Sequence, residues 1–311
     1  MIWLGWRQQR TETLIAAALL ALVAAILVPS GIEMAHAYSR DGLSHCLGFN
    51  KAGGNLACGN VIGSFEQRFS KYSSLVDWFT LLPGLIGVVL AAPYALELER
   101  GTNRLAWTQS ITRRRWVTTK LGLAAGSALV AATALILLLV WWRQPFVRLD
   151  GRMDNGVFDS QGVVIIGYTL FALGLALAIG AVWRRAIPAV MVAFVGYFVA
   201  RIFTDIWLRQ RFAPTESLTW RPANGPDPAR LRHAWVITEG PSDKFGHLLG
   251  AGKASVCAGP GCPFPGPPNW MHAVFVPASD FWSLQFTELG LFAAIALALI
   301  AFAGWWTLHR E

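Results

Sequence analysis

The chain has 311 residues, of which 54% are hydrophobic and 14% are charged, and its mean hydropathy is +0.45. A soluble domain of this size could not bury so much apolar surface, so the composition excludes a soluble globular protein. A net charge of +8 is common in nucleic-acid-binding proteins, but here the basic residues flank apolar segments, and membrane topology explains them without a nucleic-acid partner.

Six apolar segments are candidates for membrane-spanning helices, each of which takes about 20 residues to cross the hydrocarbon. The predicted spans are residues 13–28, 78–96, 121–142, 162–182, 186–208 and 289–308. Backbone polar groups in lipid must be bonded within the protein, and a helix achieves this by itself. The sequence therefore predicts an all-α integral membrane protein, a six-helix bundle that forms a single domain over residues 1–311.

Before the first span, tryptophan and arginine recur at helical spacing, which predicts a short N-terminal helix in the membrane interface. These residues are Trp3, Trp6, Arg7 and Arg10. Residues 35–37, Ala-His-Ala, have the pattern of a signal-peptidase site, so cleavage is one alternative. An uncleaved first helix is favoured, because five more spans follow.

Long polar segments follow the first, third and fifth spans: residues 31–75, 143–161 and 209–284. Because the last of these is rich in proline and glycine, we expect an irregular cap rather than long helices or central strands. The cysteines of the chain fall in these segments: Cys46, Cys58, Cys257 and Cys262. Pairing of Cys46 with Cys58 and of Cys257 with Cys262 is favoured, although four cysteines allow three connectivities.

The distribution of basic residues predicts the orientation. If the N-terminus is cytoplasmic, the inner segments contain 11 Lys and Arg in 42 residues, whereas the three long outer segments contain 14 in 140. The inner segments are residues 1–12, 97–120, 183–185 and 309–311. Because lysine and arginine close to the spans are retained in the cytoplasm, both termini are predicted to lie there. The cysteines then lie outside, where disulfides persist.

Two charges fall within the fifth predicted span. Arg201 and Asp205 are one helical turn apart, and an unpaired charge in the membrane costs about 2.5 kcal/mol or more, so we predict that they form an ion pair. Their position in the outer third of the membrane leaves two roles open for Arg201. It either extends to the outer interface or lines the transport path.

The connector of residues 97–120 is the most unusual part of the sequence. Gly101 suits the left-handed end of a helix, and Thr102 can cap the next one. Leu105 and Trp107 would lie about 200° apart around a short helix, which would be apolar on opposite faces. One face can rest on the bundle, and the other needs a partner to cover it. A basic interfacial helix without a partner is the alternative.

At these residues the chain resembles the permease subunits of ABC-2 type exporters. In that family the second span ends in the pattern E-x-x-x-G-T, and a coupling helix and a lysine at the third span follow. The matching residues are Glu97, Gly101, Thr102, Thr112, Arg113 and Lys120. Ser110 stands where many members have proline. Residues 277–292, PASDFWSLQFTELGLF, also resemble the start of the last span in permeases of high-GC bacteria.

The resemblance implies a non-enzymatic subunit of an ATP-driven exporter in the bacterial plasma membrane. It implies two permease chains, identical or different, in contact with membrane lipid, and two separate ATPase chains that hold the ATP and Mg²⁺. Leu105 and Trp107 would contact the ATPase, Arg104 would add polar contacts, and Glu97 would pair with Lys120. We expect no catalytic, metal-binding or cofactor-binding residue in this chain. A drug, a peptide, a lipid and a secondary metabolite all remain possible substrates.

Two other classes stay open. A secondary transporter or channel would need intramembrane carboxylates for ion coupling, and only Asp205 qualifies. A membrane-embedded enzyme or sensor would act through its outer cap, but the chain has no G-x-S-x-G nucleophile motif. The segment 246–255, GHLLGAGKAS, fails the phosphate-loop pattern at His247 and Ala254.

Overall fold

The computed structural model describes residues 2–46, 56–102, 112–153, 155–221, 229–231, 233–249 and 270–310. Within this part of the chain, six helical segments are long and apolar enough to cross a membrane. They contain the helices α1 (Ile2–Arg40), α3 (Leu82–Arg100), α5 (Arg113–Asp150), α7 (Val164–Trp183), α8 (Ala186–Phe203) and α10 (Phe281–His309). The prediction of a mostly helical protein with six helices able to cross a membrane is therefore confirmed.

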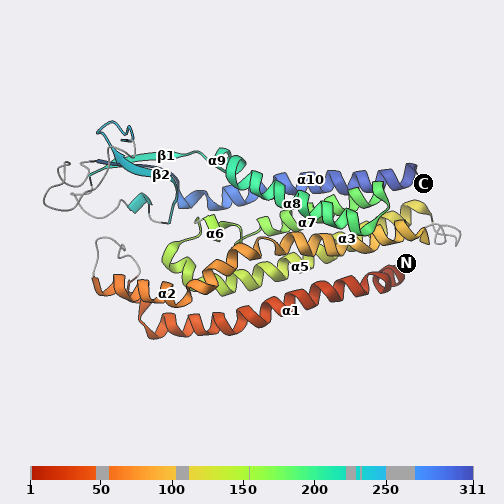
Figure 1. The fold of residues 1–311 in the computed structure, drawn as a ribbon, viewed down its shortest axis with the longest axis horizontal. Helices are drawn as coiled ribbons and strands as arrows, with labels where there is room; N and C mark the ends of the chain where they lie inside the picture. The colour runs from red at the N-terminus through yellow and green to blue at the C-terminus, as the bar shows by residue number, and fades with distance from the viewer. Residues whose placement is uncertain are drawn as a thin grey trace.

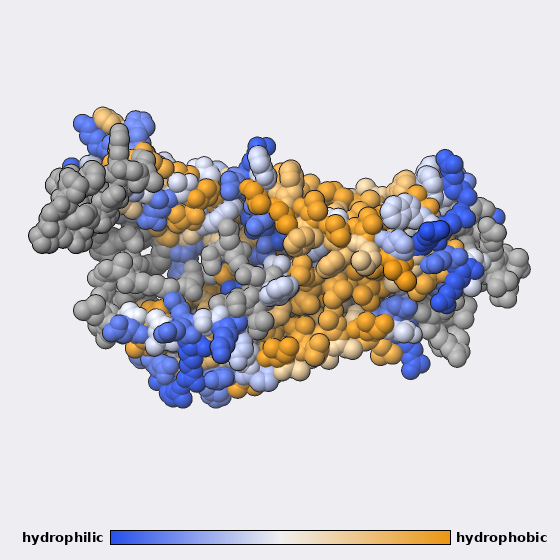
Figure 2. All heavy atoms as spheres, in the orientation of Figure 1, coloured by the Kyte–Doolittle hydropathy of each residue, from blue (hydrophilic) through white to orange (hydrophobic). Residues whose placement is uncertain are grey.

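The bundle is elongated, and its helices run roughly along the long axis (Figure 1). Both chain termini and the α7–α8 turn lie at one end, which we call the terminal end. A small β-sheet lies at the other, which we call the sheet end. Apolar side chains cover the middle of the visible surface, and hydrophilic side chains gather toward both ends (Figure 2). This distribution matches a protein that crosses a bilayer several times, with its middle in hydrocarbon.

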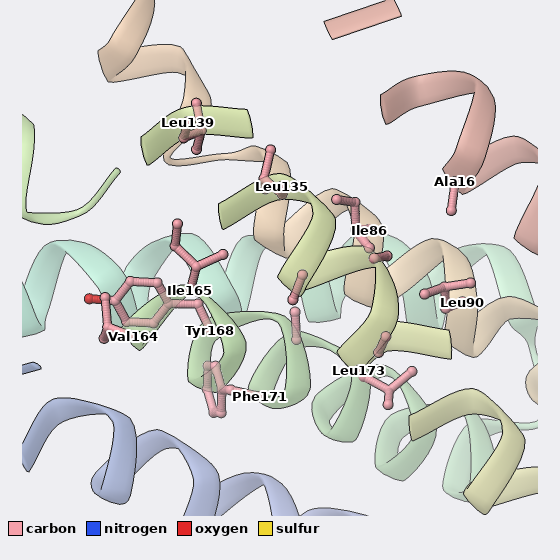
Figure 3. Close-up of a cluster of buried hydrophobic side chains, with 14 of the residues drawn as sticks. Ala16, Ile86, Leu90, Leu135, Leu139, Val164, Ile165, Tyr168, Phe171 and Leu173 are labelled. Atoms are coloured by element: carbon pink, nitrogen blue, oxygen red, sulfur yellow. The ribbon is translucent and has the colours of Figure 1, made fainter. Parts of the chain in front are cut away.

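Helix α7 is the central element of the bundle. In its apolar window 78% of the residues are buried, a far larger share than in the peripheral α1, α8 and α10. Leu173 of α7 belongs to the same buried apolar cluster as Ile86 and Leu90 of α3 (Figure 3). Gly87 allows this close approach, because a Cβ there would lie 2.5 Å from the carbonyl oxygen of Thr169. Small residues at helix contacts are the usual way to pack helices tightly in a membrane.

Several helices extend beyond the predicted spans. Helix α1 runs without a break from Ile2 to Arg40, so the predicted interfacial helix is not a separate element. The segment 31–75, predicted as a loop, contains the end of α1 and most of α2 (Leu56–Phe79). Helix α5 likewise continues to Asp150. Hydropathy marks only where a helix enters hydrocarbon, and a helix can continue through polar sequence outside it.

The segment 209–284 contains a sheet where we predicted an irregular cap, so that prediction and the all-α class were wrong in this part. Strands β1 (Glu216–Trp220), β3 (Trp270–Val276) and β2 (Trp235–Ser242) form an antiparallel sheet in the order β1-β3-β2. The prediction rested on two runs rich in proline and glycine, most of whose residues lie outside the described part. The strands come from stretches with valine, threonine and tryptophan, which favour β-structure.

A second, smaller apolar core joins the sheet to the helices. Trp235 and Val276 of the sheet pack with Phe281 and Leu284 of α10 and with Phe158. Short elements complete this end: η1 (Leu43–Cys46), α6 (Asn155–Phe158), the π-helix η2 (Thr204–Leu208), α9 (Arg209–Phe212), η4 (Ala229–Leu231) and η5 (Ala278–Asp280).

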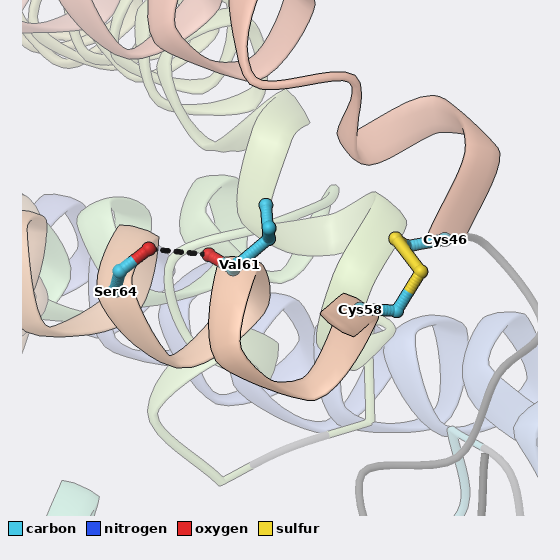
Figure 4. The surroundings of a disulfide bond; sticks show 4 residues. All are labelled: Cys46, Cys58, Val61 and Ser64. Carbon is cyan, nitrogen blue, oxygen red and sulfur yellow. Dashed lines mark hydrogen bonds between the residues drawn. A yellow bond between two sulfur atoms is a disulfide. The ribbon is translucent and has the colours of Figure 1, made fainter. Parts of the chain in front are cut away.

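The predicted disulfide between Cys46 and Cys58 is present, with the two Cα atoms 5.5 Å apart. It joins η1, which follows α1, to the first turn of α2 (Figure 4). Cys257 and Cys262 lie outside the described residues, and their pairing stays a prediction. The bridge ties α2 to the end of the long first helix at the sheet end.

Replacing Cys46 and Cys58 together by serine is expected to lower the free energy of unfolding by about 3 kcal/mol, because the bridge closes a loop of 12 residues that the unfolded chain would otherwise leave open. Unfolding of the purified chain in mixed micelles measures this. Ser64→Ala, an exposed change on α2, is the control and should alter stability by less than about 0.5 kcal/mol. Free thiols at both cysteines in non-reducing peptide maps would contradict the pairing.

Candidate functional site

Helix α3 ends at the connector in a tight, well-defined turn. Gly101 adopts the left-handed conformation with φ 67°, and its N–H donates to the carbonyl oxygen of Leu98. The hydroxyl of Thr102 donates to the carbonyl oxygen of Glu97, so it closes the end of α3 as well. A residue with a side chain would be strained at position 101, so glycine is needed here to turn the chain out of the helix.

Glu97 and Lys120 clamp the two ends of the connector together. The Lys120 ammonium donates to Glu97 Oε1 at 2.5 Å, and the lysine is only 7% exposed. The pair joins the last turns of α3 to the first turns of α5, although 23 residues separate them in sequence. Removal of one partner would leave the other charge buried, so this contact holds the two helices together more firmly than a surface pair. Arg104, Leu105 and Trp107 lie outside the described residues.

Helix α3 makes two further polar contacts near the terminal end. Glu99 Oε2 accepts a hydrogen bond from the backbone N–H of Ala186 at the beginning of α8, with a distance of 2.8 Å. One turn earlier, the hydroxyl groups of Tyr94 and Thr307 lie 2.6 Å apart, which ties α3 to α10. The end of α3 that leads into the connector is thus bonded to three other membrane helices.

A cluster of charged side chains is buried toward the sheet end of the bundle. Arg201 donates to Asp159 at 2.5 Å and to Glu288 at 3.2 Å. Arg209 also bonds both carboxylates, with its Nε 3.3 Å from Glu288. The Tyr168 hydroxyl donates to Glu288, and the Arg201 guanidinium lies over the Tyr168 ring, 3.8 Å from its centroid. We call these five residues the ionic cluster. It connects α7, α8, α9, α10 and the segment after α6.

The predicted ion pair between Arg201 and Asp205 is replaced by other pairs. Asp205 accepts from Arg209 at 2.6 Å, while Arg201 turns inward to Asp159 and Glu288. In a uniform α-helix, eight residues turn about 800°, so Arg209 would point about 80° away from Arg201. The π-helix Thr204–Leu208 accommodates about one extra residue in its turn and removes most of this offset. Both arginines therefore reach the same two carboxylates.

The burial of Arg201 contradicts one of the two roles left open for it, and a place in the transport path stays a prediction. The residue is 7% exposed and is bonded to protein carboxylates, so it does not extend to the outer interface. Its contacts lie among the helices of the bundle.

Sequence reasoning missed Asp159, Arg209 and Glu288. Each lies just outside a predicted span, where a charge is ordinarily solvated, and so none was treated as an intramembrane residue. The sequence does contain a signal, because all three residues lie within three positions of the outer end of a predicted span. Asp159 and Glu288 come just before such an end, and Arg209 comes just after one. In a bundle of antiparallel neighbours these boundaries meet at the same end.

Gln285 holds the segment that presents Asp159. Its amide oxygen accepts from the N–H of Val164, and its amide nitrogen donates to the carbonyl oxygens of Phe158 and Gln161 at 3.1 and 2.8 Å. Gly162, with φ 98°, makes room, because a Cβ there would lie 2.6 Å from the Gln285 amide oxygen. A fully buried glutamine with every polar atom bonded fixes this turn and orients the carboxylate beside it.

Asp243 and His247, whose side chains are of metal-ligand type, hold together a turn that follows strand β2. His247 donates to Asp243, and this hydrogen bond lowers the pKa of the Asp243 carboxyl to about 2. The other carboxylate oxygen accepts from the N–H groups of Phe245 and His247. In the described part of the chain, no group of three or more His, Cys, Asp or Glu side chains is placed to hold a metal ion. Asp243 thus stabilises a local turn on the surface.

Comparison with known families identifies the bundle. A family model described as ABC-2 membrane transporter related matches residues 17–209, more than half of the chain. The chain belongs to this family. No curated protein and no solved structure matches this ABC-2 family protein. The matched region includes Glu97, Lys120 and both arginines of the ionic cluster. Glu288 lies after the end of the matched region.

Proposed function

We propose that this ABC-2 family protein is the permease subunit of an ATP-driven exporter and that a separate ATPase chain hydrolyses the ATP. The observation that carries the proposal is the Glu97–Lys120 clamp. It lies at the terminal end, within the family match, and it closes both ends of the connector into one unit. A segment held in this way transmits an applied force to α3 and α5 together.

In this mechanism the terminal end faces the cytoplasm. The ATPase binds the connector through Leu105 and Trp107, with Arg104 at the edge of the contact. Closure of two ATPase chains around ATP moves the connectors of two permease chains, and the bundle changes between inward-facing and outward-facing states. Lipid surrounds the apolar middle of the molecule. The substrate class is left open.

Co-purification tests the function most directly. The chain is expressed with an ABC ATPase from the same genome, solubilised, and purified through a tag on the permease. We expect a stable complex with equal numbers of the two chains, and an ATPase rate that differs from that of the isolated ATPase. If no ATPase chain is retained in the complex under mild detergent, the proposal fails.

Cysteine labelling tests the orientation. Ser217 of β1 and Ser279 of η5 are exposed at the sheet end, so cysteines at these positions should react with an impermeant maleimide in intact cells. A cysteine at Ser110 in the connector should react only after the cells are permeabilised. The basic residues of the terminal end favour this orientation. Labelling of Ser110→Cys in intact cells, with no labelling of the other two, would invert the topology.

An ion-coupled transporter is the second candidate, and the fully buried Glu288 is the observation that favours it. Ion coupling needs a carboxylate that exchanges its ion or proton during the cycle. Glu288 is instead bonded to two arginines and a tyrosine, and each arginine also bonds Asp159. These contacts suit a structural role, so the ATP-driven exporter is better supported.

A further inference from the structure

Glu99 lies where the connector end of α3 meets the beginning of α8. Trp183 ends α7, and α8 begins at Ala186, so the chain reverses within Arg184 and Arg185. Arg184 adopts a left-handed conformation with φ 51° to make this turn. Arg185, directly before α8, makes no side-chain cap, so the first N–H groups of α8 need acceptors from elsewhere. Glu99 supplies one from another helix.

The contact is chemically well matched. A carboxylate at a helix N-terminus accepts from a free N–H and also interacts favourably with the positive end of the helix dipole. Ala186 is buried, so its N–H has little access to water as an alternative partner. The Glu99 carboxylate is exposed on its other side, which keeps its charge solvated. The bond therefore costs little desolvation and satisfies a buried donor.

Glu97 and Glu99 lie about 200° apart around α3, and they bind different helices. Glu97 holds Lys120 of α5, and Glu99 holds Ala186 of α8. Gly101 and the rest of the connector follow directly. Force applied to the connector is therefore delivered at a point where α3, α5 and α8 are bonded together.

The other end of α8 leads into the ionic cluster. Near the sheet end, α8 is bonded to the turn that leads into α3, since the Tyr197 hydroxyl donates to the carbonyl oxygen of Thr80, two residues before α3, at 2.7 Å. Tyr197 also packs against Gly84, where a Cβ would lie 2.4 Å from its ring. Beyond Tyr197, α8 carries Arg201 into the ionic cluster with Asp159 and Glu288. Helices α3 and α8 are thus joined at both ends of their shared length.

From these contacts we infer that Glu99 is a positioning residue that couples the connector to α8, so that α3 and α8 move as one body and the movement reaches the ionic cluster. This inference rests on the proposed function, because it assumes that an ATPase acts on the connector. Glu99 itself touches neither a substrate nor a nucleotide in this scheme. Its role is to keep the beginning of α8 attached to α3.

The contact can be tested in the isolated chain. Glu99→Ala should raise the hydrogen-exchange rate of the Ala186 amide in lipid nanodiscs about fivefold, as expected for loss of a helix cap. Glu99→Gln keeps an acceptor oxygen and should restore most of the protection. Unchanged exchange in Glu99→Ala would show that the contact does not hold α8, and the inference would fall whatever the ATPase does.

The coupling is tested in the complex with the ATPase. Spin labels on cysteines at the exposed Ser39 of α1 and Ser217 of β1 report movement at the sheet end. Addition of ATP and vanadate should change their distance in the otherwise unchanged chain. Glu99→Ala should reduce this distance change at least twofold without altering the affinity for the ATPase. Glu99→Gln should show a distance change close to that of the parent chain.

Ala186→Pro provides an independent variant, because it removes the N–H donor at the first position of a helix, where proline is tolerated. Arg185 already has the extended conformation that a following proline requires. Both variants remove the same hydrogen bond. The double variant Glu99→Ala/Ala186→Pro should therefore reduce the distance change no further than either single variant does. A normal distance change in Glu99→Ala would refute the inference and leave the exporter proposal intact. Absence of any change in the parent complex would refute both.

Discussion

Replacing Glu288 by glutamine is expected to lower the free energy of unfolding by about 3–5 kcal/mol, the largest effect of any single change considered for this protein. Glu288 is fully buried and accepts hydrogen bonds from Arg201, Arg209 and Tyr168. Without its charge, the two buried guanidinium groups are left with Asp159, which they share, and with the partly exposed Asp205, which bonds Arg209. Glutamine has nearly the same shape, so the loss reports the missing charge rather than a cavity.

Glu33→Gln is the matched control. Glu33 pairs with Arg68 at 2.9 Å, but about half of each side chain is exposed, so water screens the pair. Its removal should cost no more than about 1 kcal/mol. Unfolding of both variants in mixed micelles gives the comparison. Equal losses for Glu288→Gln and Glu33→Gln would show that the ionic cluster is hydrated and adds little stability.

A double-mutant cycle tests which carboxylate Arg201 binds. Replacing Arg201 and Glu288 together should cost less than the sum of the single changes by about 1 kcal/mol or more, because the partners are in contact. The cycle between Arg201 and Asp205 should show a smaller coupling, since Asp205 bonds Arg209 instead. The reverse order of the two couplings would contradict the described pairing.

Replacing Leu105 and Trp107 by aspartate is expected to weaken binding of the ATPase at least tenfold. A buried aromatic anchor typically contributes about 2 kcal/mol or more to an interface, and a new charge in its place adds a desolvation cost. Insertion into the membrane should continue, because neither residue lies in a predicted span. Binding is measured by titrating labelled ATPase onto the permease in nanodiscs.

Gln109→Asp is the control for this experiment. It adds a charge to the same connector without removing an apolar side chain, so it should change the affinity by less than about threefold. The connector would not be the docking site if Leu105→Asp/Trp107→Asp bound the ATPase as tightly as Gln109→Asp does.

Much of the transmembrane architecture could be predicted from the sequence, because a long apolar segment has few stable arrangements outside a bilayer. All six predicted spans overlap helices of the structure. The ends of the helices could not be predicted in the same way. Helix α1 continues to Arg40 through sequence beyond the predicted span, and Met34 and Tyr38 of this extension are packed against other parts of the protein.

In the candidate site, too, some contacts could be predicted from the sequence and others could not. The pairing of Glu97 with Lys120 was predicted from a family pattern, and the structure contains this pair. The partners of Arg201 were not predictable, because Asp159 and Glu288 lie 42 residues before it and 87 residues after it. Which distant carboxylate meets Arg201 depends on the packing of α7, α8 and α10. A local rule, such as pairing one turn apart, could not anticipate the π-helix that re-aims Arg209.

The ionic cluster has a further consequence for how the protein responds to the membrane potential. Within its five residues two arginines face two carboxylates, so these residues carry no net charge, while Asp205, which bonds Arg209 from outside the cluster, has a side chain that is 42% exposed. Moving one elementary charge across 100 mV takes about 2.3 kcal/mol of electrical work, but moving a neutral group takes almost none. Movement of these five residues together therefore adds almost no voltage dependence of its own. An energised membrane neither drives nor opposes this movement, and its energy has to come from elsewhere.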